Sequence, residues 1–350
     1  MLRTVDVKIH VLRNGTRYSQ LFPVEGSAPQ LRMDASGSIP MTLSGDFIVN
    51  PEVDWMADEL QPVLEIDGEE KPIGIYLPGT VTVNENSTTK TMHVEAYDRC
   101  WQVKDNKTDT QVYFAAGTNY VEAVRSVLAR CGISLIFSTP TDETLKTVRQ
   151  DWPLGTAYLE IVNELLDEIN YKPLWFNSQG VAMIEPKTVP TAENIMHTLD
   201  EDKITSLLLP QIQWESDIYN APNVFICVCS NPDLPVPMVA RAENNNPQSP
   251  LSIMRRGRRI VSFSAVDNIA SQAALDAYAN RLVFDSMTSG EIIRVSTALL
   301  TDFGVGDVTA LHYGDLAAIC IERGWTMELK PGGTMTHRLE RVVINLEFNS

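Results

Sequence analysis

A twelve-residue segment of the sequence is repeated 38 positions further on. Residues 117–128 and 155–166 are identical at six of their twelve positions, and both copies begin with Gly-Thr. Apolar residues then recur at three- and four-residue spacing, which predicts an amphipathic helix in each copy. The Thr hydroxyl of each copy is expected to accept from the free amides of the first helical turn. The repeat therefore predicts a small domain built by duplication.

Each copy also indicates where its helix ends. Gly132 and Asn170 occupy equivalent positions, and these residue types best tolerate the left-handed backbone conformation that closes a helix. Apolar runs follow in both copies, at 133–137 and 171–176. The predicted unit is a helix, a stop and a strand, present twice. A phosphate-binding interpretation of the Gly-Thr pairs is weak, because no Lys follows the first pair at P-loop spacing.

Residues 1–98 are predicted to be all-β. Apolar and polar residues alternate from Val5 to Val11, which is the period of a strand with one buried face. Asn14-Gly15 is a strong hairpin signal, and the acidic residues around Gly68 fit a solvated hairpin better than a calcium loop, whose spacing is absent. Further short apolar runs lie at 39–48, 63–66, 73–77, 81–83 and 92–96. Such a series predicts a small barrel or sandwich.

The third segment, 196–350, is predicted to be β-rich with one long helix. A strand region is predicted at 218–228, and the Asn- and Pro-rich stretch 231–250 is predicted to be a loop. From Asp267 to about Phe284 the apolar spacing becomes helical, with Gly290 just past the end. Strand-like runs follow at 292–300, 305–311, 317–321, 325–329 and 342–348.

These patterns predict a β-rich α+β fold in three domains. A first β domain occupies 1–98, a duplicated α/β domain 99–195, and a second β domain 196–350. If the third segment holds a domain like the first, residues of about 241–290 are an insertion that splits it.

Composition excludes several classes of protein. The chain is 44% hydrophobic and carries a net charge of −17, whereas affinity for nucleic acids comes mainly from cationic side chains. We therefore expect no tight binding of DNA or RNA. No apolar run reaches the roughly 18 residues of a membrane span, and the first residues lack the apolar core of a signal peptide. We expect a soluble protein that is not exported by the general secretory route.

No catalytic, cofactor-binding or metal-binding residue is predicted. The odd number of cysteines, spread over three regions, is a poor disulfide framework and indicates reduced core residues. They are Cys100, Cys131, Cys227, Cys229 and Cys320. The five histidines show no metal-ligand spacing, and His337 is expected to be a surface or hydrogen-bonded histidine. Folding could still bring two of the many carboxylates together as a hydrolase pair, which the sequence does not single out.

One cationic cluster stands against the acidic background, at Arg255, Arg256, Arg258 and Arg259. Four guanidinium groups in five residues repel one another unless carboxylates or phosphates lie close by. In a strongly acidic protein, another copy of the chain can supply those carboxylates. The cluster is therefore a candidate subunit interface, and changing all four to Ser is expected to weaken self-association. A solvated loop leading into a strand remains an equal alternative.

The order of segments and a set of short motifs resemble a known family, the baseplate or tail hub proteins of tailed phages and related contractile injection particles. The resemblance spans nearly the whole chain. It is carried by Ala-Gly-Thr at 116–118, Leu-Gly-Thr at 154–156, Asp-Ile-Tyr-Asn at 217–220 before the strand 224–228, Ala-Arg-Ala-Glu-Asn at 240–244, the turn 249–252, the helix 267–284, Gly-Asp-Val at 306–308, Trp325, Gly332-Gly333 and Met335.

The resemblance implies a structural protein and not an enzyme. Hubs of this family are homotrimers whose two tube-like β domains per chain form a ring of pseudo-sixfold symmetry. The ring joins the tail tube, or its initiator protein, to the central spike and contacts other baseplate proteins. The implied location is the virion tail or baseplate, assembled in the bacterial cytoplasm. An acidic channel wall would let DNA or protein cargo pass without binding it.

Two alternatives remain open at this point. The duplicated Gly-Thr helix, with Gly132-Ile133-Ser134 after it, faintly resembles a LysM repeat, which would make the chain a peptidoglycan-binding protein. A hydrolase with a hidden carboxylate pair would make it a cell-wall-degrading, tail-associated protein. A pull-down on purified cell wall and an assay for wall lysis separate these alternatives from a hub.

Overall fold

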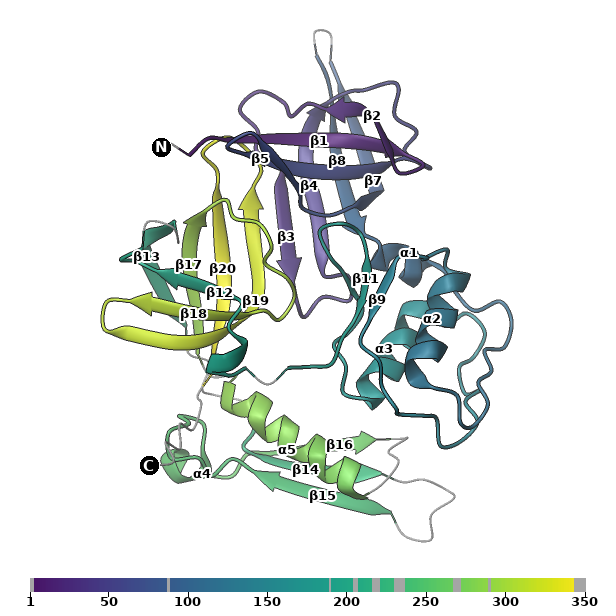
Figure 1. Ribbon diagram of the computed structural model, residues 1–350, viewed down its shortest axis with the longest axis vertical. Helices are drawn as coiled ribbons and strands as arrows, with labels where there is room; N and C mark the ends of the chain where they lie inside the picture. Colours follow the sequence, from purple (N-terminus) through teal and green to yellow (C-terminus); the bar gives the residue numbers. More distant parts are fainter. Residues whose placement is uncertain are drawn as a thin grey trace. The chain divides into compact units, whose positions relative to one another are not determined.

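The computed structural model of the protein describes residues 3–86, 89–188, 190–203, 207–215, 221–229, 237–266, 272–288 and 291–342. Strands account for 45% and helices for 16% of the structure, which confirms the predicted β-rich class. The chain, whose elements are labelled in Figure 1, divides into two compact units. Unit 1 consists of Met1–Thr188, Thr297–Val305 and Arg323–Thr336, and unit 2 of Val189–Ser296, Gly306–Glu322 and His337–Ser350.

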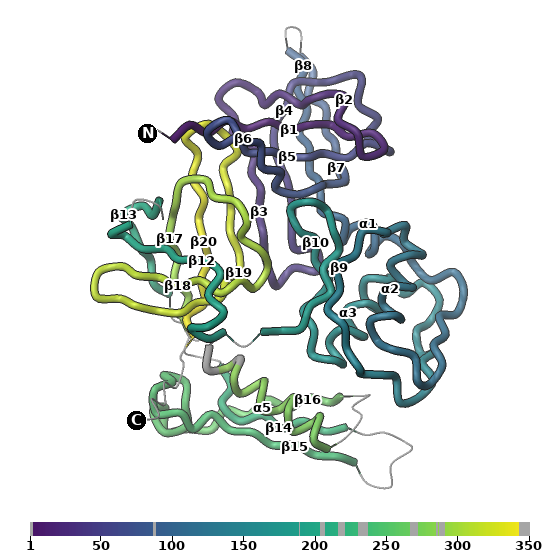
Figure 2. The backbone as a smooth tube through the Cα atoms, viewed as in Figure 1, coloured from purple at the N-terminus to yellow at the C-terminus, as the bar shows by residue number. Residues whose placement is uncertain are grey.

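Unit 1 begins with an antiparallel sheet that curls back on itself. Its strands are β1 (Val5–Arg13), β2 (Thr16–Leu21), β3 (Gln30–Asp34), β4 (Met41–Ile48), β5 (Glu59–Ile66), β6 (Glu69–Pro72), β7 (Tyr76–Glu85) and β8 (Lys90–Asp98). Their order is β3-β4-β8-β7-β5-β1-β2, with β6 beside β5. After β2, the amide of Val24 donates to the Asp46 carbonyl and the amide of Ile48 to the Phe22 carbonyl. These bonds join the end of β2 to β4 and close the sheet (Figure 2).

The turns of this sheet follow the sequence signals. Asn14 and Gly15 have φ of 52° and 74°, so they form the predicted hairpin turn between β1 and β2. Asp67 and Gly68, with φ of 53° and 87°, turn β5 into β6 as the predicted acidic hairpin. The apolar runs at 73–77 and 81–83 were predicted as separate strands. They overlap a single strand, β7, which has a register shift near Pro78. Strand β3, with its buried Leu31 and Met33, was not predicted.

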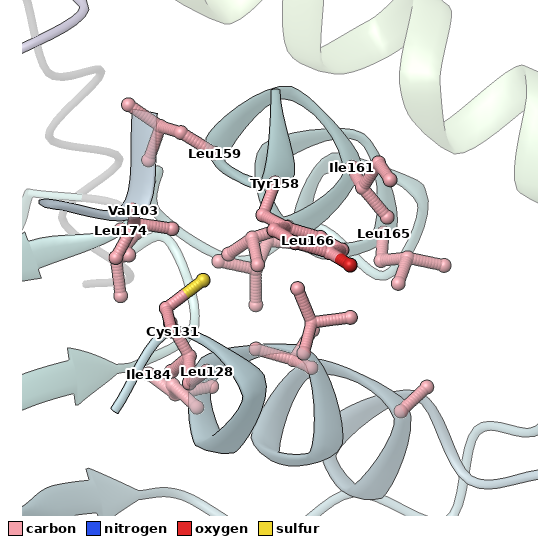
Figure 3. Packing of buried hydrophobic residues seen from close by; sticks show 14 of the residues in the cluster. Val103, Leu128, Cys131, Tyr158, Leu159, Ile161, Leu165, Leu166, Leu174 and Ile184 are labelled. Atoms are coloured by element: carbon pink, nitrogen blue, oxygen red, sulfur yellow. The ribbon is translucent and has the colours of Figure 1, made fainter. Parts of the chain in front are cut away.

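The next part of unit 1 holds the duplicated segment. It contains α1 (Cys100–Asp105), α2 (Tyr120–Arg130), β9 (Ile136–Ser138), α3 (Tyr158–Glu168), β10 (Trp175–Phe176) and β11 (Ala182–Ile184). Gly132 and Asn170 have φ of 77° and 63°, which confirms both helix stops. The apolar faces of α2 and α3 share one buried core (Figure 3). Leu128 and Leu166, at equivalent positions of the repeat, are both fully buried in it.

The helix caps differ from the prediction. The side chain of Asn119, not the preceding Thr, caps α2 by accepting from the amides of Val121 and Glu122. In α3 the equivalent residue is Ala157, which cannot cap. The hydroxyl of Thr156 instead donates to the carbonyl of Pro153 at 2.8 Å. Each helix therefore begins one residue later than it would if the Thr were its N-cap residue.

Backbone hydrogen bonds join the two copies of the repeat at their Gly-Thr pairs. In the first copy, the Gly117 amide donates to the Leu145 carbonyl at 2.8 Å, and the Leu145 amide donates to the Thr118 carbonyl at 2.9 Å. In the second copy, Gly155 and Thr156 make the same two bonds with Thr108, at 2.8 and 2.9 Å. The segment before each helix thus pairs with the start of the other helix, so the copies exchange their leading segments.

In the duplicated α/β part, one buried guanidinium forms ion pairs with several acidic side chains. The side chain of Arg149 is 4% exposed and forms ion pairs with Asp151, Glu164 and Glu168. Its guanidinium also lies 4.5 Å from the ring centre of Trp152. Burial raises the pKa of Glu168 and Arg149 lowers it, with burial the larger effect. Arg149 therefore compensates carboxylates that the fold has partly removed from water.

A buried carboxyl group lies where β8 meets α1. Asp98 Oδ1 accepts from the amide of Cys100 at 2.9 Å, and Oδ2 accepts from the amide of Met41 at 3.2 Å. Burial raises the pKa of Asp98 to about 7, although both hydrogen bonds oppose the shift. Desolvation of the charged form is thus the dominant effect.

We expect Asp98→Asn to remove part of the pH dependence of stability. Because the pKa in the folded state lies above the ordinary value of 3.8, the folded protein holds a proton that the unfolded chain releases. The stability that Asp98 contributes is present below about pH 4 and is lost as the pH rises through about 7. Thermal unfolding at about pH 5 and about pH 8 checks this: relative to the wild type, the variant should gain about 2–3 kcal/mol between the two pH values, because roughly two pH units separate pH 5 from the folded-state pKa of about 7. The same difference at both pH values would contradict the assignment.

Unit 2 contains a second β part. Its elements are a short 3-10 helix (Ala192–Asn194), β12 (His197–Asp200), β13 (Leu208–Glu215), β17 (Ile292–Ala298), β18 (Val308–Tyr313), β19 (Leu316–Glu328) and β20 (Thr334–Val342). Strand β12 pairs with β18 in parallel, and β18 pairs with β19 antiparallel. The last two residues of β17, the residues of β19 from Arg323 onward and the first three residues of β20 belong to unit 1. Residues 324–328 of β19 pair with β3. The His337 imidazole lies fully buried, 2.7 Å from the Glu322 carboxylate, so this histidine is hydrogen-bonded as expected.

Unit 2 also holds a separate three-stranded sheet. It consists of β14 (Val224–Cys229), β15 (Met238–Glu243) and β16 (Val261–Val266), in the order β15-β14-β16. Helix α5 (Gln272–Thr288) packs on one face of this sheet (Figure 1), where Phe225, Ala240 and Leu275 are buried together. The short helix α4 (Ile253–Arg256) lies in the connection from β15 to β16.

The structure corrects two predictions for the third segment. Residues 231–250 were predicted as a loop, but β15 occupies 238–243, because Ala240 and Ala242 are buried on one face and alternate with Val239, Arg241 and Glu243 on the other. The two runs at 317–321 and 325–329 belong to one strand, β19, since the intervening residues continue its pairing from β18 to β3. Asp267, Gly290, the motif at 217–220 and the strand-like residues 343–348 lie outside the described residues.

Candidate assembly surface

A buried asparagine holds the loop that carries the arginine cluster. The side chain of Asn223 is fully buried. Its Nδ2 donates to the carbonyls of Leu251 and Arg258, at 3.1 and 3.0 Å, and its Oδ1 accepts from the Ile260 amide at 2.8 Å. Gly257 closes α4 with a φ of 64°. Because three bonds to one side chain fix both ends of the loop, the arginines project from a defined backbone.

The four arginines fall into two pairs. Arg256 is half-buried and donates to the Ala221 carbonyl at 2.6 Å, and burial lowers its pKa. Arg259 donates to Glu243 Oε1 at 2.6 Å. Arg255 and Arg258 are exposed and form no ion pair with any residue that the structure describes. The loop thus keeps two guanidinium groups available for a partner.

Glu243 is the one carboxylate in direct contact with the cluster among the described residues. Its Oε1 accepts from Arg259 and also from Arg241, at 2.6 and 2.7 Å. The hydrogen bond from Arg259 lowers the pKa of Glu243 to about 2. Glu243 therefore remains charged at every physiological pH, and the cluster keeps a net positive charge beside it.

The face of the three-stranded sheet opposite α5 is largely apolar, and most of its residues on the two edge strands are exposed, whereas Val224 of the central strand is buried. We call it the open face; its residues are Val224, Ile226 and Val228 of β14, Val239, Arg241 and Glu243 of β15, and Val261, Phe263 and Ala265 of β16. Phe263 is 66% exposed, Val261 56% and Val239 55%. Neighbouring apolar residues exposed to this extent are typical of an interaction site.

In β16 the apolar side chains lie on the exposed face of the sheet, whereas such a pattern normally places them on the buried face. Val261, Phe263 and Ala265 alternate with Ser262 and Ser264, which normally predicts that the apolar set is buried. The register with β14 instead places Ser262 beside Phe225, on the side of the sheet that bears α5. Alternation shows which residues share a face but not which face is covered. Sequence reasoning found the arginines and missed the open face.

Other kinds of site are not apparent in the part of the chain that the structure describes. No group of three or more His, Cys, Asp or Glu side chains is arranged to hold a metal ion there. The helices of that part are too short or too polar to cross a bilayer. All five cysteines are buried and none forms a disulfide with a described residue, which confirms that they are core residues.

The fold is that of phage tail proteins. No protein-family model and no curated protein matches the sequence. Among solved structures, the tail protein from Neisseria meningitidis MC58 superimposes with a TM-score of 0.67 at 13% identity, over 96% of both chains. The prophage MuSo2 43 kDa tail protein from Shewanella oneidensis gives 0.67 at 10% identity, over 95% of this chain and 98% of that one. A component of the E. coli type VI secretion system, similar in structure to the T4 tail proteins gp27 and gp5, gives 0.50 at 10% identity, over 98% of this chain and 75% of that one.

Proposed function

We propose that this protein is the structural hub of a phage tail or of a phage-tail-like injection particle. One observation carries the proposal: two tail proteins share its fold over at least 95% of this chain and of theirs. A likeness over the whole length, and not over one domain, supports a shared architecture. The likeness to a secretion-system component extends the proposal to injection devices other than phages.

In this proposal three chains form a ring of pseudo-sixfold symmetry. Residues 1–98 and 196–350 supply two tube-like β domains per chain, with the duplicated α/β domain of 99–195 between them and an insertion in the second. Three copies of two similar domains give six positions around one axis. Such a ring matches a sixfold tail tube on one side and a threefold spike on the other.

The partners of the hub are the tail tube or its initiator protein, the central spike and other baseplate proteins. The ring acts through its shape and carries out no chemical step. The net charge of −17 fits a channel wall that repels DNA and acidic protein cargo during passage. The hub is assembled in the bacterial cytoplasm and remains in the tail or baseplate.

Electron microscopy and sedimentation of the purified protein test this function. We expect rings with threefold symmetry and a particle mass three times the 39.0 kDa of one chain. With the arginine cluster in the contact, the ring should dissociate more readily as the salt concentration rises. A monomer at every concentration, or a twofold dimer, would refute the ring.

A further inference from the structure

The open face and the loop beside it form a cationic region in an acidic protein. The described residues 237–266 carry five arginines and a single carboxylate, Glu243, whereas the whole chain has a net charge of −17. The region also exposes Phe263, Val261 and Val239. Its ideal partner therefore offers apolar side chains surrounded by carboxylates.

We propose that the open face is one half of a head-to-tail contact between copies of this chain. In this contact, the open face and arginine loop of one copy bind an acidic surface of the next copy. The inference rests on the proposed function, because it takes self-assembly as given, and it adds which surface carries the assembly. The occupant is a second copy, since the rest of each copy supplies the negative charge that the region lacks.

Charge also determines the geometry of the contact. In a twofold dimer the same surface meets itself, which would bring two sets of five arginines together. Like charges opposed at an interface cost several kcal/mol, so the region is a poor partner for itself. A contact between two different surfaces repeats from copy to copy and closes into a ring when the rotation allows it. The open face is thus suited to a ring and unsuited to a dimer.

Individual residues have distinct roles in this contact. Phe263 is the most exposed aromatic side chain of the open face, and buried aromatic anchors dominate the affinity of many interfaces. Arg255 and Arg258 form no ion pair with the described residues, so they are available to carboxylates of the neighbouring copy. Arg241 and Arg259 already share Glu243 and are expected to contribute less.

Two variants and a matched control test the contact by analytical ultracentrifugation over a range of concentrations. We expect Phe263→Ser and the double variant Arg255→Ser/Arg258→Ser each to raise the dissociation constant of the ring about tenfold or more. Phe137→Ser, in β9, removes a similarly exposed ring (52%) far along the sequence and should leave assembly unchanged. All of these side chains are exposed, so thermal unfolding should show that every variant is folded.

A photo-reactive benzoylphenylalanine at position 263 identifies what lies on the open face. We expect cross-links between two copies that map outside residues 237–266, which a head-to-tail contact requires. Cross-links from 263 to residues 237–266 of the second copy would overturn the head-to-tail geometry. Two results together would overturn the contact itself and leave the proposed hub standing: rings that form normally with Phe263→Ser, and no cross-link from rings that carry benzoylphenylalanine at position 263. A wild-type protein that never assembles would instead refute the hub.

Discussion

Replacing Arg149 with Met is expected to destabilise the protein by about 3–5 kcal/mol, because it removes the only cation that the structure places among Asp151, Glu164 and Glu168. Methionine fills much of the same volume but leaves the carboxylates uncompensated. Glu168 is affected most, since its side chain is only 13% exposed. Chemical denaturation at neutral pH measures the loss.

The pH dependence of this loss identifies its electrostatic origin. Without Arg149, burial and the nearby Glu164 carboxylate are opposed only by the hydrogen bond from Tyr120, so the pKa of Glu168 should rise further. Protonation at about pH 5 then relieves part of the penalty, and the deficit should be smaller there than at about pH 8. Arg125→Met, which removes an exposed arginine of α2, should cost about 0.5 kcal/mol or less at either pH. A deficit that is the same at both pH values would indicate lost packing instead of lost charge.

Truncation of the two equivalent leucines is expected to cost about 2–5 kcal/mol each. Leu128 in α2 and Leu166 in α3 are both fully buried in the shared core (Figure 3). Because they occupy the same position of the repeat, Leu128→Ala and Leu166→Ala should cost similar amounts. Denaturant titration of each variant measures the free energy of unfolding.

Leu154→Ala is the matched control for these truncations. Leu154 precedes the second Gly-Thr pair and is exposed, so the same chemical change should cost about 0.5 kcal/mol or less. If one of the two buried leucines proved as tolerant as Leu154, the two helices would not share a single core.

The sequence predicts best where a local rule fixes the backbone. Asn14-Gly15 determines its hairpin, and Gly132 and Asn170 end their helices, because each residue type tolerates a conformation that others avoid. The start of α2 is harder to predict from the sequence, since Thr118 and Asn119 are both good capping residues. In the structure Asn119 is the one that caps the helix. The strand β15 was missed because its neighbours are rich in Asn and Pro, which usually mark loops.

The assembly surface could be predicted only in part. Four arginines within five residues are visible in the sequence, so Arg255 and its neighbours were identified as a candidate interface. The exposure of Phe263 depends on which face of the sheet α5 covers, and that is decided by contacts between distant segments. The buried Asn223, which holds the loop, gives no sequence signal either, because a single Asn before a strand is common in loops.

The exchange of leading segments within the α/β domain has a consequence for its origin. Half of the domain on its own leaves the amide and carbonyl groups at its Gly-Thr pair bonded to water, since their protein partners at Leu145 and Thr108 belong to the opposite half. With the two halves on separate chains, those groups would pair with protein only when two molecules associate. Duplication within one chain makes the pairing intramolecular, at a fixed effective concentration that does not depend on how much protein the cell makes.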